Sequence, residues 1–298
     1  MNNKAFIEKV AKTIFVVCAV VAIFAVVAIT LYMFIKGIPA LYEVGISELL
    51  FGTTWKPTAD SPSYGIAFII LSSILGTALS ILIGVPVALL TAVYLSEMAG
   101  KNLRRVVSSA VELLAAVPSV IYGLIGMMVL NPLMYKLELI IFKNDSNHQF
   151  TGGANFISAV IVLAIMILPT VINVSNSSLR AVAQNLRAAS LALGATKEQT
   201  IFKVVIPAAK SGILTGIVLG IGRALGEAMA INMVAGGAVN IPLPFNSVRT
   251  LTTQIVSEMG YAQGLHRQVL FTVGLVLFIF IMIVNFILLK VRKREVSK

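Results

Sequence analysis

The sequence predicts an all-α integral membrane protein of about six transmembrane helices, and three observations carry this prediction. Hydrophobic residues make up 58% of the 298 residues, while charged residues make up only 12%, about half the share in a soluble domain. The mean hydropathy is +0.96. Several uncharged apolar runs reach the roughly 20 residues that a helix needs to cross a bilayer. No long polar stretch remains to form a soluble domain.

Six apolar segments are expected to cross the membrane. They are residues 13–35, 66–94, 113–135, 156–174, 211–235 and 268–289. The second contains Gly84-Val85-Pro86, and the third and fourth contain Pro118 and Pro169, where a helix interior loses a backbone hydrogen bond. The apolar core of the first is too long for a signal peptide and no cleavage site follows it, so we expect a retained helix.

The distribution of Lys and Arg predicts the orientation. With both termini in the cytoplasm, sixteen basic residues fall on the cytoplasmic side and six on the other, which is the asymmetry of the positive-inside rule. These loops account for the net charge of +11. Basic patches interleaved with aromatic residues are absent, so we expect no nucleic-acid partner and expect lipid to surround the chain.

Few residues offer enzymatic or metal chemistry. Cys18 stands alone in an apolar run, and His148 and His266 lie far apart in polar loops, where we expect both to be solvated. No G-x-x-x-x-G-K-[ST] phosphate loop occurs, since the nearest sequence, Pro207–Ser211, lacks the glycines. We therefore expect no metal site, no cofactor bound by this chain and no ATPase or other enzyme activity of its own.

The connection between the fourth and fifth spans, residues 175–210, has a helical pattern instead of a linker composition. Gly194 can end a first short helix as its C-terminal cap. Thr196 then begins a second helix with Gln199 three residues on, the spacing of a capping box. The sequence predicts a helix, a tight turn and a second helix against the cytoplasmic face.

This loop resembles that of importer-type ATP-binding-cassette (ABC) permeases, whose pattern is Glu-Ala-Ala, three residues, Gly, nine residues, Ile-x-Leu-Pro. Here Ala188-Ala189-Ser190, Gly194, Val204 and Ile206-Pro207 occupy those places. Ala188 departs from the usual glutamate, so a polar contact with the ATPase through Arg187 or Asn185 is expected instead. The resemblance implies ATPase docking by Asn185, Arg187, Ala188, Ala189, Gly194 and Pro207. The alternative is an amphipathic surface helix without a partner.

Further segments resemble the phosphate-specific permeases of this family. These are residues 112–123, 193–196 and 222–230, while 233–236 and 249–252 favour the C-type subunit (PstC) over the A-type. The resemblance runs from about Trp55 to Asn285. It implies the type I importer permease (MetI-like) fold over 64–290 with a coupling loop at 180–207. The cytoplasmic N-terminus, 1–12, the first transmembrane helix, 13–35, and a basic cytoplasmic tail, 291–298, flank this domain.

Two charged residues lie inside the predicted fifth span. Arg223 and Glu227 are four residues apart, so they can meet on one helix face, which they share with Gly212, Gly216 and Gly220. An arginine at the bilayer centre costs roughly 2.5–3.5 kcal/mol, and such residues usually mark a functional site. Arg223 offers a planar fork of donors that matches phosphate, and Glu227 can neutralise it or accept a hydrogen bond from protonated phosphate. The alternative is a structural salt bridge.

Other polar groups beside prolines are weaker pathway candidates. Ser119 and Tyr122 follow Pro118, and Thr170 follows Pro169. Broken helices at membrane depth often line cavities, although each of these residues can equally be an ordinary packing group. Glu112 is expected at the interface, paired with Arg104 or Arg105.

Together these features imply the permease subunit of an ABC importer for inorganic phosphate, in the bacterial cytoplasmic membrane. The resemblance implies an A-type second permease, a cytoplasmic ATPase dimer that uses ATP and Mg²⁺, and an extracytoplasmic phosphate-binding protein. A permease for sulfate or molybdate is the first alternative. An ion-coupled secondary transporter is the second, although the chain shows no internal inverted repeat of the kind common in that class.

Overall fold

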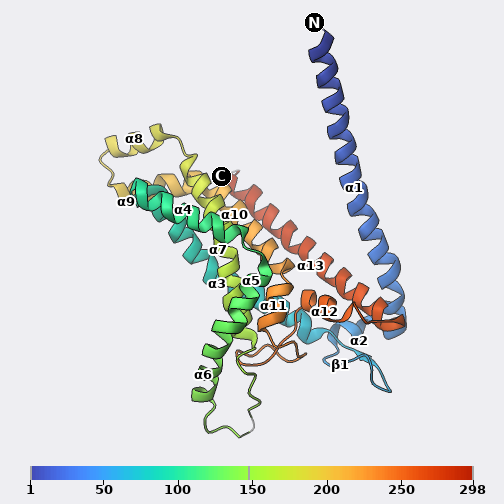
Figure 1. Ribbon diagram of the computed structural model, residues 1–298. Helices are drawn as coiled ribbons and strands as arrows, with labels where there is room; N and C mark the ends of the chain where they lie inside the picture. Colours follow the sequence, from blue (N-terminus) through green and yellow to red (C-terminus); the bar gives the residue numbers. More distant parts are fainter. Residues whose placement is uncertain (1, 147, 297–298) are drawn as a thin grey trace.

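The computed structural model describes residues 2–146 and 148–296, and most of them are helical. Figure 1 shows an elongated helical bundle in which α4 and α8 lie at one end with the two termini, and the β1–β2 hairpin lies at the other. We call these the α8 end and the hairpin end. The hairpin pairs Trp55–Lys56 (β1) with Ser63–Tyr64 (β2) in antiparallel register.

Six helices within the described residues are long and apolar enough to cross a membrane, as predicted. They are Ile7–Val44, Ala67–Met98, Ser119–Ile141, Phe156–Arg180, Lys197–Gly226 and Gly264–Ile287. The first lies within α1 (Asn2–Val44) and the last within α13 (Gly264–Val296). Of the expected basic tail 291–298, the helix continues through Val296, while 297–298 and the side chains of 291–296 lie outside the described part.

The first helix stands apart from the bundle. Figure 1 shows α1 meeting α13 near the hairpin end and diverging from it toward the N-terminus. Along its most apolar stretch none of the residues is buried. At the hairpin end, Gly37 lets α1 approach the backbone of α13, where Thr272 donates a hydrogen bond to the Gly37 carbonyl at 2.7 Å.

The third span begins six residues later than predicted. Residues 113–116 belong to α4 (Lys101–Ala116), which ends before Pro118, and α5 (Ser119–Ile125) follows. Val117 is extended, with ψ of 126°, because a residue before proline is driven out of the helical region. The span continues through the π-helical segment η2 (Gly126–Leu130) and α6 (Asn131–Ile141).

The fifth span also differs from the prediction, which placed one helix over 211–235. A continuous helix begins at α9 (Lys197–Thr200), passes through the π-helical η3 (Ile201–Val205) and ends with α10 (Ile206–Gly226). Glu227 is extended, and a separate short helix, α11 (Met229–Val234), follows.

The core lies around α7 (Phe156–Arg180), which packs between α3 (Ala67–Val93) and α10. Gly212, Gly216 and Gly220 face α7, and a Cβ at Gly212 would lie 2.1 Å from the Ser178 hydroxyl. This confirms that the glycine face of α10 is a close-packing surface. The π-helical η1 (Tyr94–Met98) extends α3 at the α8 end, and α2 (Ile46–Phe51) and α12 (Leu251–Glu258) lie at the hairpin end.

Candidate functional site

The loop at the α8 end has the predicted helix, turn and helix. Helix α8 (Gln184–Ala192) has no buried residue, and Leu193 after it is 88% exposed. Gly194 takes a φ of +85°, a conformation that favours glycine. Thr196 and Gln199 form the expected capping box at the start of α9. The loop therefore exposes apolar side chains of α8 and Leu193 to solvent, and its turn and the start of α9 are fixed by Gly194 and the capping box.

Arg187 does not point outward from this loop as expected. Its guanidinium donates to the Glu97 carboxylate of η1 at 2.9 Å and to the Leu179 and Val182 carbonyls. These bonds tie α8 to the ends of two transmembrane helices, so Arg187 positions the loop. Asn185, Ala188 and Ala189 remain exposed.

The loop is also joined internally and to the fifth span. The hydroxyls of Ser190 and Thr200 lie 2.9 Å apart and join the two helices of the loop. Pro207 lies exposed directly after η3, inside the continuous helix, where its missing N–H leaves one backbone hydrogen bond of the helix unmade. The loop thus continues without a break into the fifth span.

The predicted pairing of Arg223 with Glu227 is wrong. Helix α10 ends at Gly226, so Glu227 does not lie one helical turn above Arg223. The Glu227 carboxylate instead accepts a hydrogen bond from the Ala230 N–H at 2.9 Å, which caps the start of α11. Among the described residues, Arg223 has neither an ion pair nor a hydrogen bond, and its side chain is half-buried. The helix ending was hidden because Gly226 and Ala228 are ordinary residues of transmembrane helices.

Of the other predicted pathway residues, the structure brings Tyr122 near Arg223. The two side chains are close enough to interact electrostatically across α5 and α10. The buried Tyr122 hydroxyl donates to the Leu114 carbonyl at 2.7 Å, across the break at Pro118. Ser119 and Thr170 are half-buried at the start of α5 and in the middle of α7, and neither makes a contact that assigns it a role.

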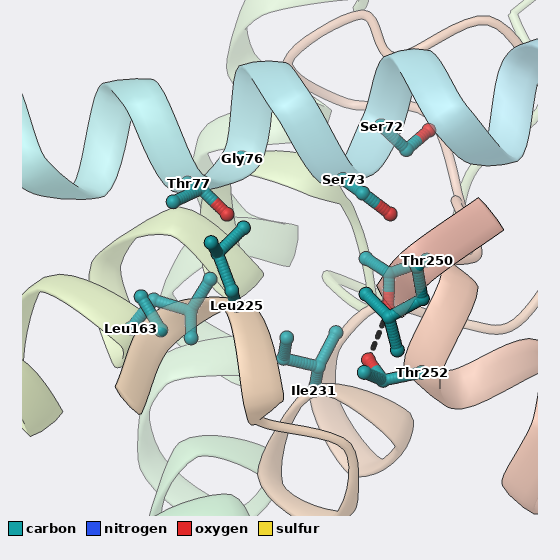
Figure 2. Close-up of a pocket in the computed structure, with 11 residues that line it drawn as sticks. Ser72, Ser73, Gly76, Thr77, Leu163, Leu225, Ile231, Thr250 and Thr252 are labelled. Atoms are coloured by element: carbon teal, nitrogen blue, oxygen red, sulfur yellow. Dashed lines mark hydrogen bonds between the residues drawn. The ribbon is translucent and has the colours of Figure 1, made fainter. Parts of the chain in front are cut away.

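A small cavity next to α10 is lined by apolar side chains and by hydroxyl-bearing residues that the sequence analysis missed (Figure 2). Ser72, Ser73 and Thr77 reach it from α3, and Thr250 and Thr252 reach it from the start of α12. Its volume of about 10 Å³ is near the minimum for one water molecule. Serine, glycine and threonine recur along one face of α3 at 72, 73, 76, 77 and 80, which was the available signal.

Thr252 connects this cavity to Glu227. Its hydroxyl donates to the Glu227 carbonyl at 2.7 Å, and the Ser73 hydroxyl accepts from the Leu251 N–H at 2.8 Å. The carbonyl that α10 leaves unpaired where it breaks is thus satisfied by α12. The break after Arg223 is therefore held from two sides, by the carboxylate cap on α11 and by this hydroxyl.

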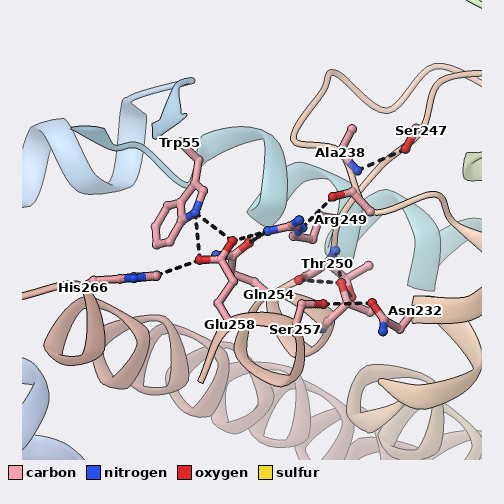
Figure 3. A network of polar contacts seen from close by, with 12 residues as sticks. Trp55, Asn232, Ala238, Ser247, Arg249, Thr250, Gln254, Ser257, Glu258 and His266 are labelled. Atoms are coloured by element: carbon pink, nitrogen blue, oxygen red, sulfur yellow. Dashed lines mark hydrogen bonds and ion pairs between the residues drawn. The ribbon is translucent and has the colours of Figure 1, made fainter. Parts of the chain in front are cut away.

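At the hairpin end, Glu258 lies at the centre of a buried polar network (Figure 3). Its carboxylate accepts from Arg249, from the Trp55 indole at 3.0 Å and from His266 at 2.7 Å. His266 is 8% exposed, so the expectation of a solvated loop histidine is wrong. Burial, and next the charge of Glu258, raise the pKa of nearby Tyr261, against the opposing effect of Arg249.

The other histidine is also not a solvated loop residue. His148 lies 2.9 Å from the fully buried Glu138 carboxylate and stacks on Phe142 at 3.7 Å between ring centres. The Thr151 N–H and hydroxyl also donate to Glu138. The carboxylate therefore folds the segment after α6 back onto the helix. Within residues 2–146 and 148–296, no three His, Cys, Asp or Glu side chains gather to hold a metal ion.

Comparison with known proteins agrees with this architecture. The probable ABC transporter permease protein YqgH of Bacillus subtilis is 36% identical over 96% of this chain and 92% of its own length. The phosphate transport system permease protein PstC of Pasteurella multocida is 34% identical over 84% of this chain and 82% of its own.

The fold itself also has a solved counterpart. A chain of the MetNI methionine ABC transporter, at 22% identity, matches 78% of this chain and 94% of its own length with a TM-score of 0.52. This confirms the predicted MetI-like permease fold. The family model for binding-protein-dependent transport system inner membrane components matches residues 80–296. The chain is therefore a multi-pass membrane protein that belongs to the family of binding-protein-dependent transport system inner membrane components.

Proposed function

We propose that this chain is the C-type permease subunit of an ABC importer that moves inorganic phosphate across the bacterial cytoplasmic membrane. Several relatives that align along most of their length carry the name phosphate transport system permease protein PstC, and this supports the substrate. The excess of Lys and Arg at the α8 end supports placing both termini in the cytoplasm.

The α8 loop is proposed to dock a separate ATPase, which supplies ATP and Mg²⁺ chemistry that this chain does not perform. The observation behind this role is a helix without a single buried residue, fixed in place by Arg187 and Gly194. Asn185, Ala188, Ala189 and Pro207 supply the exposed surface. The complete transporter further contains an ATPase dimer, an A-type second permease and an extracytoplasmic phosphate-binding protein.

Arg223 is proposed to line the phosphate path, and one observation carries this proposal. It is a permanent cation in an apolar span, half-buried and without a partner among the described residues. Such a charge is costly unless it meets water, an anion or another chain. Tyr122 is near enough to interact with it electrostatically, and Ser119 and Thr170 are further polar groups near the broken helices. Glu227 enters the proposal as a positioning residue, because it caps α11 where α10 ends.

The test is uptake of labelled phosphate by cells that lack their own high-affinity system. The cells express this chain with its binding protein, partner permease and ATPase, in the presence of excess sulfate or molybdate. We expect uptake that resists both competitors and falls at least about tenfold in Arg223→Ala, which loses a charge-assisted contact. Arg267→Ala, an exposed arginine at the hairpin end, is the matched control. Uptake blocked by a competitor would assign another oxyanion, and uptake that survives Arg223→Ala would make this arginine structural.

Glu227→Gln separates the cap from the charge. The amide oxygen can still accept from the Ala230 N–H, so we expect uptake and phosphate preference to persist, whereas Glu227→Ala loses both the cap and uptake. If Glu227→Gln alone abolishes the preference for phosphate over sulfate, the carboxylate itself contacts the substrate.

A further inference from the structure

An open cavity at the α8 end carries more positive charge than its surroundings neutralise. Its volume is about 650 Å³, and the residues that line it are Ala99, Lys101, Arg104, Arg105, Ser108, Ser109, Glu112 and Arg180. Four of these side chains are cations and one is a carboxylate. The cavity lies between α4 and the last turn of α7, away from Arg223 and from the exposed surface of α8.

Three of the four cations have no hydrogen-bond or ion-pair partner among the described residues. Arg104 is held by the carbonyls of Leu95, Ser96 and Ala99, which it caps at the end of η1. In the described part of the chain, Lys101, Arg105 and Arg180 make no hydrogen bond or ion pair, and neither does Glu112. The sequence expectation that Glu112 pairs with Arg104 or Arg105 is therefore not met.

A buried hydroxyl in the lining of this cavity also lacks a partner. The Ser108 oxygen is inaccessible to solvent and has no hydrogen-bond partner, which is uncommon for a buried polar atom. Ser108 shares one face of α4 with Lys101, Arg105 and Glu112, because these residues follow one another at intervals of four, three and four. One wall of the cavity thus offers a cation, a hydroxyl and a carboxylate in a row, opposite Arg180.

This arrangement fits the chemistry of a phosphate group. Guanidinium forks bind phosphate oxygens in pairs, and a hydroxyl donates to a third oxygen. We propose that the cavity between α4 and α7 binds one phosphate-bearing anion through Arg105, Arg180 and Lys101, with Ser108 as a hydrogen-bond donor once its side chain rotates toward the cavity. This site is separate from the transport path and does not depend on which anion is transported.

Two sources can supply such a phosphate group. Helix α4 also exposes an apolar stripe beside the basic one, where Val106 is 67% and Leu113 71% exposed, as in helices that lie at a membrane surface. An anionic phospholipid can therefore place its headgroup in the cavity and its chains along α4. Free inorganic phosphate offers the same oxygens without the chains.

Glu112 distinguishes these sources. Free phosphate near neutral pH carries a proton on the phosphate itself that Glu112 can accept in a hydrogen bond, whereas the phosphate oxygens of phosphatidylglycerol carry none and only its glycerol hydroxyls can donate. Removing the charge in Glu112→Gln should therefore weaken the binding of inorganic phosphate more than the binding of phosphatidylglycerol.

The experiment uses the full chain purified in a neutral detergent. Inorganic phosphate binding is measured by calorimetry at low ionic strength, and phosphatidylglycerol binding by native mass spectrometry against phosphatidylcholine. We expect saturable binding of one equivalent of at least one of the two anions. The double variant Arg105→Gln/Arg180→Gln should weaken it about tenfold or more, because each guanidinium makes charge-assisted bonds.

A matched control removes the same charge elsewhere. Lys197→Gln/Lys203→Gln eliminates two exposed lysines at the same end of the bundle and should change the affinity less than twofold. Ser108→Ala should weaken binding by a smaller factor than the double arginine variant. Binding of neither anion, or an equal loss in both double variants, would overturn the proposal. Because Arg105 and Arg180 are exposed and unpaired, the variants should keep the melting temperature of the ligand-free chain.

Discussion

At the hairpin end of the bundle, buried carboxylates are enclosed by hydrogen-bonding partners within the chain, whereas at the α8 end most polar groups remain exposed. The Glu258 carboxylate accepts hydrogen bonds from Arg249, His266 and Trp55, and the Glu138 carboxylate accepts them from His148 and Thr151. At the opposite end, α8 buries nothing, and Arg105 and Arg180 have no partner among the described residues. The buried carboxylates of the hairpin end find their partners within this chain, while the α8 end is the surface that we propose other molecules bind.

The largest effect is expected when the central carboxylate of the hairpin end is removed. Glu258→Ala should destabilise the chain by about 3–5 kcal/mol, because it leaves Arg249 and His266 without their buried partner. Thermal and denaturant unfolding in detergent, followed by circular dichroism, measure the loss. Glu48→Ala, an exposed carboxylate at the same end, should change little. Equal effects of the two substitutions would mean that the network is not holding this end together.

At the α8 end, Arg187 is one of the side chains that do have partners within the chain, and removing it should loosen the loop alone. Arg187→Ala loses three hydrogen bonds from a charged donor, and bonds of this kind contribute about 1.5–3 kcal/mol each at most. We expect amide hydrogen exchange of residues 184–192 to become about tenfold faster or more, with global melting unchanged. Gln184→Ala, exposed on the same helix, is the control. A drop in global melting would instead make α8 part of the core.

Replacing the turn glycine should affect docking more than folding. Gly194→Ala places an L-residue at φ +85°, which costs roughly 1–2 kcal/mol, although nothing lies within 4 Å of the added Cβ. Co-purification with the ATPase should fall, and Gly194→Asn should recover part of it because asparagine tolerates this conformation. Gly100→Ala, with a free Cβ position and negative φ, is the control. Unchanged co-purification in Gly194→Ala would remove the loop from the docking surface.

The smallest test compares two capping boxes, one at each end. Thr250 caps α12 in a buried setting, and Thr196 caps α9 in an exposed one. Replacing a capping threonine by alanine costs about 0.5–2 kcal/mol. We expect Thr250→Ala to reach the upper part of that range, because no water replaces the lost bond, and Thr196→Ala to stay near the lower part. Equal free energies of unfolding would contradict the contrast between the two ends.

The parts that were predictable from the sequence depend on neighbours along the chain. Six apolar runs, the cap at Thr196 and the turn at Gly194 are local patterns, and all are found in the structure. The errors concern contacts between distant segments. Trp55 meets Glu258 across 203 residues, and Arg187 meets Glu97 across 90, and helical periodicity contains no information about such pairs.

The misplaced pairing of Arg223 and Glu227 has a different cause. Both residues lie in a run that is apolar throughout, and hydropathy alone cannot locate the end of a helix inside such a run. The break is stabilised by two hydrogen bonds to Glu227: the Thr252 hydroxyl donates to its carbonyl, and the Ala230 N–H donates to its carboxylate. The helix–turn–helix shape of the α8 loop was easier to predict, because its turn glycine and its capping box lie in adjacent residues.

The π-helical segment η3 has a consequence for how the loop is aimed. Across it the Ile206 N–H bonds to the Ile201 carbonyl, five residues back, so the turn holds one residue more than an α-helical turn would. Each residue of an α-helix corresponds to about 100° of rotation and 1.5 Å of rise. Because the π-helical turn already contains the extra residue, deleting one residue within 201–205 would restore an α-helical turn and leave α9 and α8 facing nearly the same way relative to the glycine face of α10, whereas deleting one residue from the α-helical part of α10 between η3 and that face would rotate them by about 100°. The extra residue therefore widens one turn of the helix without redirecting the loop that this helix carries.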